Sequence, residues 1–245
     1  MLPRLRRTFA VAGRVLTQIR NDKRTLGLLL IVPSLLIGLL SWMLDSQKMF
    51  NHVGPSLVGL FPFTIMFLLT SVTTLRERRS GTLERFLTMP LRKGEFVLGY
   101  AIAFGFLAVL QALITLSFAV YVCGLTITGE TWQLIVVAIS NAMMGMSLGL
   151  AASAFANTEF QVVQLMPAVI FPQIMLGGIF VPRSNLPDVL SSISDWLPLS
   201  HAIQALNDLT DNTPVADVQT EIWILWAWVA VAIVLGAMTL KKRTP

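Results

Sequence analysis

The stretch RERRSGTLERFLTMPLRKGE, from Arg76 to Glu95, is the long polar interruption in the first two-thirds of an apolar chain. It holds six of the 18 Lys and Arg residues and three of the 13 acidic residues. The runs on either side, 49–75 and 96–129, contain no Lys, Arg, Asp or Glu. Charged side chains are costly inside a bilayer, so a segment this charged must face water. The sequence therefore predicts that 76–95 joins two membrane spans.

The composition of the whole chain agrees with a membrane protein. Of its 245 residues, 55% are hydrophobic and 13% are charged, whereas soluble domains carry about 25% charged residues. A helix needs about 20 apolar residues to cross a bilayer, and the alternating segments of a β-barrel are absent. We predict an all-α membrane protein that forms a single transmembrane domain over 1–245. Six runs are long enough to span: 26–44, about 54–75, 96 to about 121, 132 to about 157, 160 to about 181, and 222–240.

The distribution of basic residues predicts the orientation. Sixteen of the 18 Lys and Arg residues precede the first span, lie in 76–95 or follow the last span, and six spans put these three clusters on one side. Only Lys48 and Arg183 fall on the other side, with most of the acidic residues. We therefore expect both termini and the 76–95 loop to be cytoplasmic. This topology accounts for the net charge of +5, so no nucleic-acid partner is inferred.

Residues 1–24 have the pattern of a basic amphipathic helix. Apolar side chains recur at steps of three and four residues: Leu5, Phe9, Ala12, Leu16 and Ile19. This pattern predicts an elbow helix that lies on an anionic membrane surface. A cleavable signal peptide is the alternative, but the basic region is long and no small-x-small site follows Trp42.

A half-apolar segment separates the fifth and sixth spans, over about 182–220. Three prolines make it too short-segmented to span: Pro182, Pro187 and Pro198. We predict two short helices, 187–196 and 200–209, that dip back toward the outer leaflet, because their apolar side chains would otherwise sit in water. An ordinary surface loop is the alternative.

No motif indicates an enzyme or a metal site. The chain has no GxxxxGK[ST] phosphate loop and no His, Cys, Asp or Glu group at metal-ligand spacing. Residues 145–149 match G-x-S-x-G, but that pattern needs a strand-to-helix turn, and His201 is the one half-plausible partner for Ser147. Close helix packing explains Gly145 and Gly149 better. We expect no catalytic residue, no metal and no cofactor in this chain.

The polar residues inside the predicted spans are amides. No Asp, Glu, Lys or Arg lies well inside a span, which argues against an ion-coupled carrier. Two interpretations of the amides stay open, namely interhelical hydrogen bonds and the lining of a substrate route. The amides are Gln111, Asn141, Gln164 and Gln173.

Within 76–95, the pattern predicts a short helix that begins at Gly81-Thr82 and ends before Pro90. Its apolar side chains fall on one face with charged residues beside them, which suits a docking element for a soluble partner. A solvated connector is the alternative. The predicted docking residues are Arg76, Glu77, Gly81, Thr82, Leu83, Glu84, Phe86 and Leu87.

With these features the chain resembles the membrane subunits of type-2 ABC exporters, a family that includes daunorubicin-resistance permeases. The first matching segment, after span two, comprises Glu77, Gly81, Thr82, Leu83, Glu84 and Pro90. The second, after span five, comprises Gly178, Phe180, Pro182, Leu186, Pro187 and Pro198.

The resemblance implies an ATP-driven exporter of an amphipathic drug or lipid in the bacterial cytoplasmic membrane. It implies two permease chains, identical or related, and two separate ABC ATPase subunits that hold ATP and Mg²⁺. It also implies that 76–95 contains a coupling helix and that spans one and five lie nearest the dimer axis. Export of a polysaccharide or glycolipid is the alternative within transport, and an intramembrane enzyme is a weaker one. We expect the substrate route at the subunit interface to include Phe61, Phe63, Gln164, Phe171 and Gln173.

Overall fold

The computed structural model describes residues 2–79, 93–181, 183–210 and 218–238. Within these ranges the regular structure is helical and contains no strand. The helices are α1 (Leu2–Asn21), α2 (Lys23–Leu44), α3 (Gln47–Arg79), α5 (Lys93–Tyr121), α6 (Thr131–Ala152), α7 (Glu159–Leu176), the 3₁₀ turn η1 (Arg183–Asn185), α8 (Asp188–Ser194), α9 (Pro198–Asp208) and α10 (Val218–Met238).

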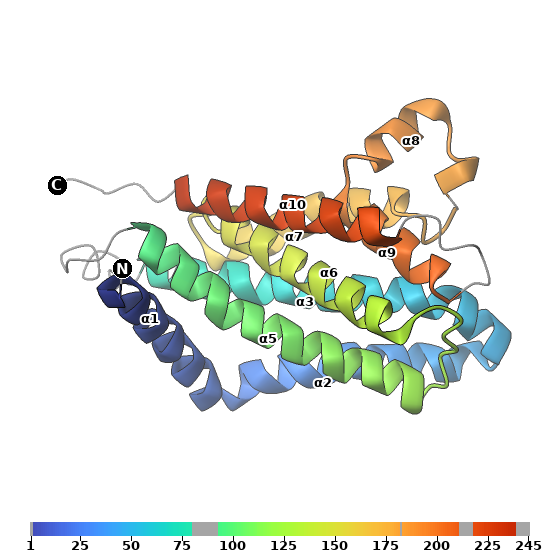
Figure 1. The fold of residues 1–245 in the computed structure, drawn as a ribbon, viewed down its shortest axis with the longest axis horizontal. Helices are drawn as coiled ribbons and strands as arrows, with labels where there is room; N and C mark the ends of the chain where they lie inside the picture. The colour runs from blue at the N-terminus through green and yellow to red at the C-terminus, as the bar shows by residue number, and fades with distance from the viewer. Residues whose placement is uncertain (1, 80–92, 182, 211–217, 239–245) are drawn as a thin grey trace.

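Six helices in the described ranges are long and apolar enough to cross a membrane, and they run lengthwise through one bundle (Figure 1). They are α2, α3, α5, α6, α7 and α10. The prediction of an all-α protein with six spanning helices is confirmed. Figure 1 shows that α1, the start of α5 and the end of α10 lie at one end of the bundle, whereas α9 lies at the other.

Helix α3 is longer than the predicted second span of 54–75. It begins at Gln47, where the Ser46 hydroxyl accepts a hydrogen bond from the Met49 backbone N–H at 3.4 Å and Phe50 is buried. At its other end it continues through Arg79, so residues 76–79 are helical rather than part of a loop. Arginine is a strong helix former, and the ion pairs described below hold this last turn in place. Residues 93–95 of the predicted loop likewise belong to a helix, α5, and the rest of that loop, 80–92, lies outside the described residues.

Helices α6 and α7 end about five residues earlier than predicted. The Ser153 hydroxyl donates to the Leu150 carbonyl at 2.6 Å just after α6 ends, and Thr158 caps the start of α7 by accepting from the Gln161 N–H at 3.1 Å. After α7, Gly178 has φ of +88°, a conformation that suits glycine and leaves the helical path. Local hydrogen bonds and backbone conformation therefore set the ends of these helices, whereas hydrophobicity alone predicted helices that were too long.

The centre of the bundle is the contact between α3 and α6. A Cβ added at Gly145 would lie 2.2 Å from the Phe63 carbonyl oxygen, and one at Gly149 would lie 2.5 Å from the Phe67 carbonyl oxygen. The packing interpretation of these glycines is therefore confirmed. Ser147, between them, donates to the Met143 carbonyl of its own helix at 2.8 Å.

Helix α1 packs against α5 with a face that only partly coincides with the predicted stripe. Ala12 and Ile19 of that stripe are buried together with Val11 and Val15, whereas Leu5 and Phe9 are 57% and 60% exposed. The sequence pattern missed this because α1 has apolar residues on two sides, and only the contact with α5 selects one. The contact is close, since a Cβ at Gly99 of α5 would lie 2.7 Å from the Val11 Cβ.

The predicted short helices between spans five and six are present as α8 and α9. Helix α9 is buried against α3, α6 and α10. Helix α8 projects from the bundle (Figure 1), and its apolar side chains are exposed, among them Val189 and Ile193. Dipping of this segment toward a leaflet therefore stays a prediction.

Candidate functional site

The candidate coupling site lies at the end of the bundle where α3 ends and α5 begins, which we call the basic end because Arg76, Arg78 and Arg79 form the last turn of α3. Arg76 holds Glu159 in the first turn of α7 with two parallel hydrogen bonds, Nε to Oε1 at 2.7 Å and Nη2 to Oε2 at 2.9 Å. Both side chains are largely exposed, so the pair fixes geometry more than it adds stability. It ties the end of α3 to the start of α7.

A second ion pair at the basic end is partly buried. The Arg14 Nη2 of α1 lies 2.6 Å from Oε1 of Glu77, and the Glu77 side chain is only 6% exposed. Removing one partner of a buried ion pair typically costs about 3–5 kcal/mol, because the other charge is left uncompensated. Glu77 therefore holds α1 against the end of α3.

The structure thus places two of the predicted docking residues, Arg76 and Glu77, near the end of α3, shortly before residues 80–92, and each is paired with a residue of another helix. Their partners, Arg14 and Glu159, were not among the predicted site residues. No local signal identified them, because the pairs are 63 and 83 residues apart in the chain. The other predicted docking residues lie outside the described residues: Gly81, Thr82, Leu83, Glu84, Phe86 and Leu87.

The predicted route residues fall into two groups. Gln164 and Phe171 lie on the exposed face of α7, and Phe61 is half-buried. Phe63 is fully buried beside α6, and Gln173 is 3% exposed. Gln173 accepts a hydrogen bond from the backbone N–H of Leu199 at 3.2 Å. In a single chain the two groups therefore do not line one surface.

The four amide side chains of the predicted spans also divide into buried and exposed ones. Asn141 of α6 donates to the Gly59 carbonyl of α3 at 2.6 Å, and Gln173 links α7 to the start of α9, so both make the interhelical hydrogen bonds that one interpretation predicted. Gln111 is fully buried in α5. Gln164 alone of the four is exposed on a membrane-length helix, where lining a route stays a prediction.

Helix α10 has an exposed apolar face that includes Trp223 and Val234, and two further spanning helices, α2 and α7, have a wide one. On α2 the exposed side chains recur at helical spacing: Leu28, Ile31, Leu35, Leu39 and Trp42. On α7 they are Phe160, Val163, Phe171 and Met175, together with Gln164. By contrast, α3 and α6 are mostly covered by other helices. These two faces are available to lipid or to a second chain.

At the opposite end, α9 is held to α10 and to the residues after α8. The His201 Nδ1 is hydrogen-bonded to Glu221, and its Nε2 donates to the Asp195 carbonyl at 2.8 Å. Arg183 pairs with Asp195. Burial opposes the charged imidazolium, but the hydrogen bonds to Glu221 and Asp195 raise the pKa of His201 above its ordinary value.

The part of the chain that the structure describes contains no group of three or more His, Cys, Asp or Glu side chains able to hold a metal ion.

The chain is similar in sequence to a known protein family and to several known proteins. A family model described as ABC-2 type transporter matches residues 7–209. ABC transporter G family member 20 of Dictyostelium discoideum is 27% identical over 202 residues, which are 81% of this chain and 28% of that protein. The probable multidrug ABC transporter permease YbhS of Escherichia coli K12 is 24% identical over 178 residues, 71% of this chain and 47% of that one. Linearmycin resistance permease protein LnrN of Bacillus subtilis is 24% identical over 185 residues, 73% of this chain and 48% of that one.

The six apolar helices and the low charge define a polytopic α-helical membrane protein. Within that class, the chain belongs to the ABC-2 type transporter family. The resemblance to ABC exporter membrane subunits is thereby confirmed, and the bacterial relatives named above are ABC transporter permeases. The chain spans about half the length of those two permeases and less of the Dictyostelium protein.

Proposed function

We propose that this chain is the membrane subunit of an ATP-driven exporter that moves an amphipathic drug or lipid out across the bacterial cytoplasmic membrane. ATP and Mg²⁺ are bound by a separate ABC ATPase subunit, present in two copies. Family membership supports the proposal, as do the names of the relatives, which speak of multidrug transport and linearmycin resistance. The 245 residues contain no phosphate loop of their own, in line with an external source of energy.

The proposal rests on two ion pairs at the basic end, Arg76 with Glu159 and Glu77 with Arg14. Residues 80–92 begin three positions after Glu77, and Arg76 and Glu77 hold α7 and α1 respectively. A force applied by an ATPase to that segment would therefore reach α1, α3 and α7 together. In our proposal the docking residues within 80–92 contact the ATPase, and Arg76 and Glu77 pass its movement to the spans.

The exposed faces of α2 and α7 support a dimer of permease chains, identical or related, because a single chain leaves these two faces uncovered. Two copies that face each other would enclose a route between them. Gln164, Phe171 and Phe61 would line that route, and Phe63 and Gln173 would support it from behind. The segment that contains α8 and α9 would cap the route and move for release.

The basic end faces the cytoplasm in this proposal, so the protein is multi-pass with both termini cytoplasmic. The positive-inside rule supports this orientation, because 16 of the 18 Lys and Arg residues precede the first span, fall within 76–95 or follow the last span in the sequence.

The experiment uses inside-out membrane vesicles that contain the chain co-expressed with its ATPase. An amphipathic fluorescent dye should accumulate in the vesicles on addition of MgATP. Gly81→Pro and Phe86→Ala should abolish this uptake and the co-purification of the ATPase, while the permease remains folded by size-exclusion chromatography. Phe9→Ala, which removes an exposed aromatic side chain of α1, is the matched control and should retain uptake. Unchanged uptake by both loop variants, or uptake without ATP, would refute the proposal.

A further inference from the structure

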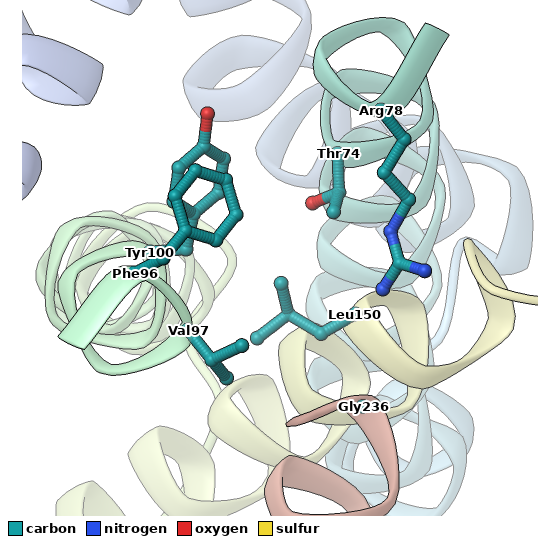
Figure 2. Close-up of a pocket in the computed structure, with 7 residues that line it drawn as sticks. All are labelled: Thr74, Arg78, Phe96, Val97, Tyr100, Leu150 and Gly236. Carbon is teal, nitrogen blue, oxygen red and sulfur yellow. The ribbon is translucent and has the colours of Figure 1, made fainter. Parts of the chain in front are cut away.

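The two ends of the bundle differ in what they contain. At the basic end, the pocket that Figure 2 shows lies between α3, α5, α6 and α10, with Arg78, Phe96 and Leu150 among its lining residues. Its accessible space is about 10 Å³, about enough for one water molecule, so it does not admit a larger ligand. The opposite end contains a connected cluster of charged side chains that the coupling proposal does not use.

That cluster anchors residues 183–195, which we call the outer lobe and which comprise η1, α8 and Asp195 at the end of α8. The lobe projects from the bundle (Figure 1), and Ser194 is the buried residue of α8. The Ser194 hydroxyl donates to the Leu176 carbonyl at 2.7 Å. Helix α9, by contrast, is buried against α3, α6 and α10. A movement at this end of the bundle would therefore involve the lobe more readily than α9.

Polar side chains join the end of the lobe to α9 and α10. Arg183 pairs with Asp195 within the lobe and is hydrogen-bonded to Gln204 of α9. His201 of α9 contacts the backbone carbonyl of Asp195 through Nε2, at 2.8 Å, and Glu221 of α10 through Nδ1. A single imidazole therefore lies between the lobe and α10.

Both ring nitrogens of His201 face hydrogen-bond acceptors. A neutral imidazole has one N–H donor, so it can satisfy the Asp195 carbonyl or the Glu221 carboxylate but not both. Both bonds form only when His201 and Glu221 together hold one further proton, whichever of the two carries it. Their side chains are 8% and 15% exposed, so water replaces a lost bond poorly. Loss of that proton therefore breaks one of the two contacts.

The surrounding groups favour the bound proton. Burial opposes the charged imidazolium, but the hydrogen bonds to Glu221 and to the Asp195 carbonyl outweigh it and raise the pKa of His201, while the charge of Arg183 acts in the opposite sense. Among the described residues, α3, α6 and α7, which also pack against α9, add no charged group that acts on His201. Both contacts are therefore complete below about pH 6.5 and are lost as the pH rises through the higher folded value.

We propose that His201 and Glu221 form a proton-dependent latch that holds the end of the outer lobe to α9 and α10. Acid on the outer side keeps the latch closed, and a rise in pH releases the end of the lobe. The inference rests on the proposed function, in which the segment that contains α8 and α9 caps the route and moves for release. Release is then slower when the outer solution is acidic than when it is neutral or alkaline.

The first measurement concerns the lobe alone and needs no transport. Spin labels on Val189→Cys of the lobe and Glu130→Cys before α6, in a Cys123→Ala background, report the distance between them in nanodiscs by pulsed electron paramagnetic resonance. The distribution should be narrow at about pH 5.5 and broad at about pH 8.5, on either side of the ordinary histidine pKa. The ratio of closed to open lobe should change about tenfold, as expected for one charged hydrogen bond.

Three variants identify the titrating group. His201→Gln does not titrate, so it should give the broad distribution at both pH values. His52→Gln is the matched control, because His52 is the other histidine of the chain and is exposed in α3, and it should keep the wild-type response. If His201→Gln does not fold, Glu221→Gln should move the broadening to lower pH. A wild-type distribution that does not change with pH would overturn the latch, as would an unchanged response in both His201→Gln and Glu221→Gln.

The second measurement separates the latch from the proposed function. Inside-out vesicles that contain the chain and its co-expressed ATPase are prepared at about pH 5.5 or about pH 8.5 inside and about pH 7 outside. A permanently charged amphipathic dye is used, because its distribution does not follow the pH gradient. MgATP-driven uptake should be several-fold faster at the higher internal pH in wild type and His52→Gln, and equal at both in His201→Gln.

The outcomes of the two measurements are distinguishable. Wild-type uptake that is equal at both internal pH values would overturn the role of the latch in release. An absence of MgATP-driven uptake, with the response of the lobe to pH intact, would instead refute the proposed function and leave the latch itself supported.

Discussion

Replacing Gly145 with alanine should destabilise the contact between α3 and α6. The new Cβ would lie 2.2 Å from the Phe63 carbonyl oxygen and 2.9 Å from its Cα and carbonyl carbon. Unstrained C···O contacts between helices are about 3.3–3.6 Å, so the helices would have to separate by about 1 Å here. Overpacking of this kind typically costs about 1–3 kcal/mol.

The control must remove the effect of helix propensity, because alanine stabilises a helix over glycine by up to about 1 kcal/mol. Gly105→Ala on α5 serves, since its Cβ would lie 3.6 Å from the end of the flexible Met143 side chain. The difference between the two variants then isolates the cost of the close contact. Gly149→Ala should fall between them, because its Cβ would lie 2.5 Å from the Phe67 carbonyl oxygen.

Thermal unfolding of purified protein, followed by the fluorescence of its six tryptophans at a fixed heating rate, measures the difference. For a chain of this size each kcal/mol lowers the midpoint by about 2–4 °C, so Gly145→Ala should unfold about 2–12 °C below Gly105→Ala. Equal midpoints would refute the close-contact argument. Rescue of Gly145→Ala by Phe63→Ala would also refute it, because the clash is with backbone atoms that alanine retains.

Three further predictions concern the two ends of the bundle. Glu77→Gln should weaken the attachment of α1 to α3 by up to about 3–5 kcal/mol and expose α1 to protease in vesicles. Limited proteolysis measures this exposure, and cleavage at the wild-type rate would contradict a structural role for the ion pair of Glu77 with Arg14. The raised pKa of His201 means that its attachment of α9 is fully present below about pH 6.5 and is lost as pH rises through the higher folded value. Hydrogen exchange in α9 should therefore increase with pH beyond its intrinsic pH dependence, and His201→Gln should abolish that excess; an excess that persists in the variant would exclude His201 as its cause. Glu130→Cys in a Cys123→Ala background should react with an impermeant thiol reagent in whole cells, and protection there would reverse the proposed orientation.

The amino-acid sequence by itself determined the class of protein and the number of spans. Lipid requires about 20 apolar residues per crossing whatever their neighbours are, so composition and run length were sufficient. Length also limited the third span, because a helix over all of 96–129 would be about 51 Å long, against a bilayer core of about 30 Å. Part of that run therefore had to project beyond the hydrocarbon or form a turn, and in the structure α5 ends at Tyr121. The prolines and apolar steps of α8 and α9 likewise identified two short helices.

Only the tertiary structure decided which side chains make the contacts between the helices of one chain. Val11 rather than Phe9 faces α5, and Gln173 rather than Gln164 is buried, although each pair is equally apolar or equally polar. Arg14 with Glu77, and Arg76 with Glu159, meet only because helices distant in sequence converge at the basic end. Hydrophobic pattern constrains how a helix sits in lipid, whereas the choice of neighbour depends on close contacts such as Gly145 against Phe63. Those contacts are properties of paired surfaces, and no single segment of the sequence contains both.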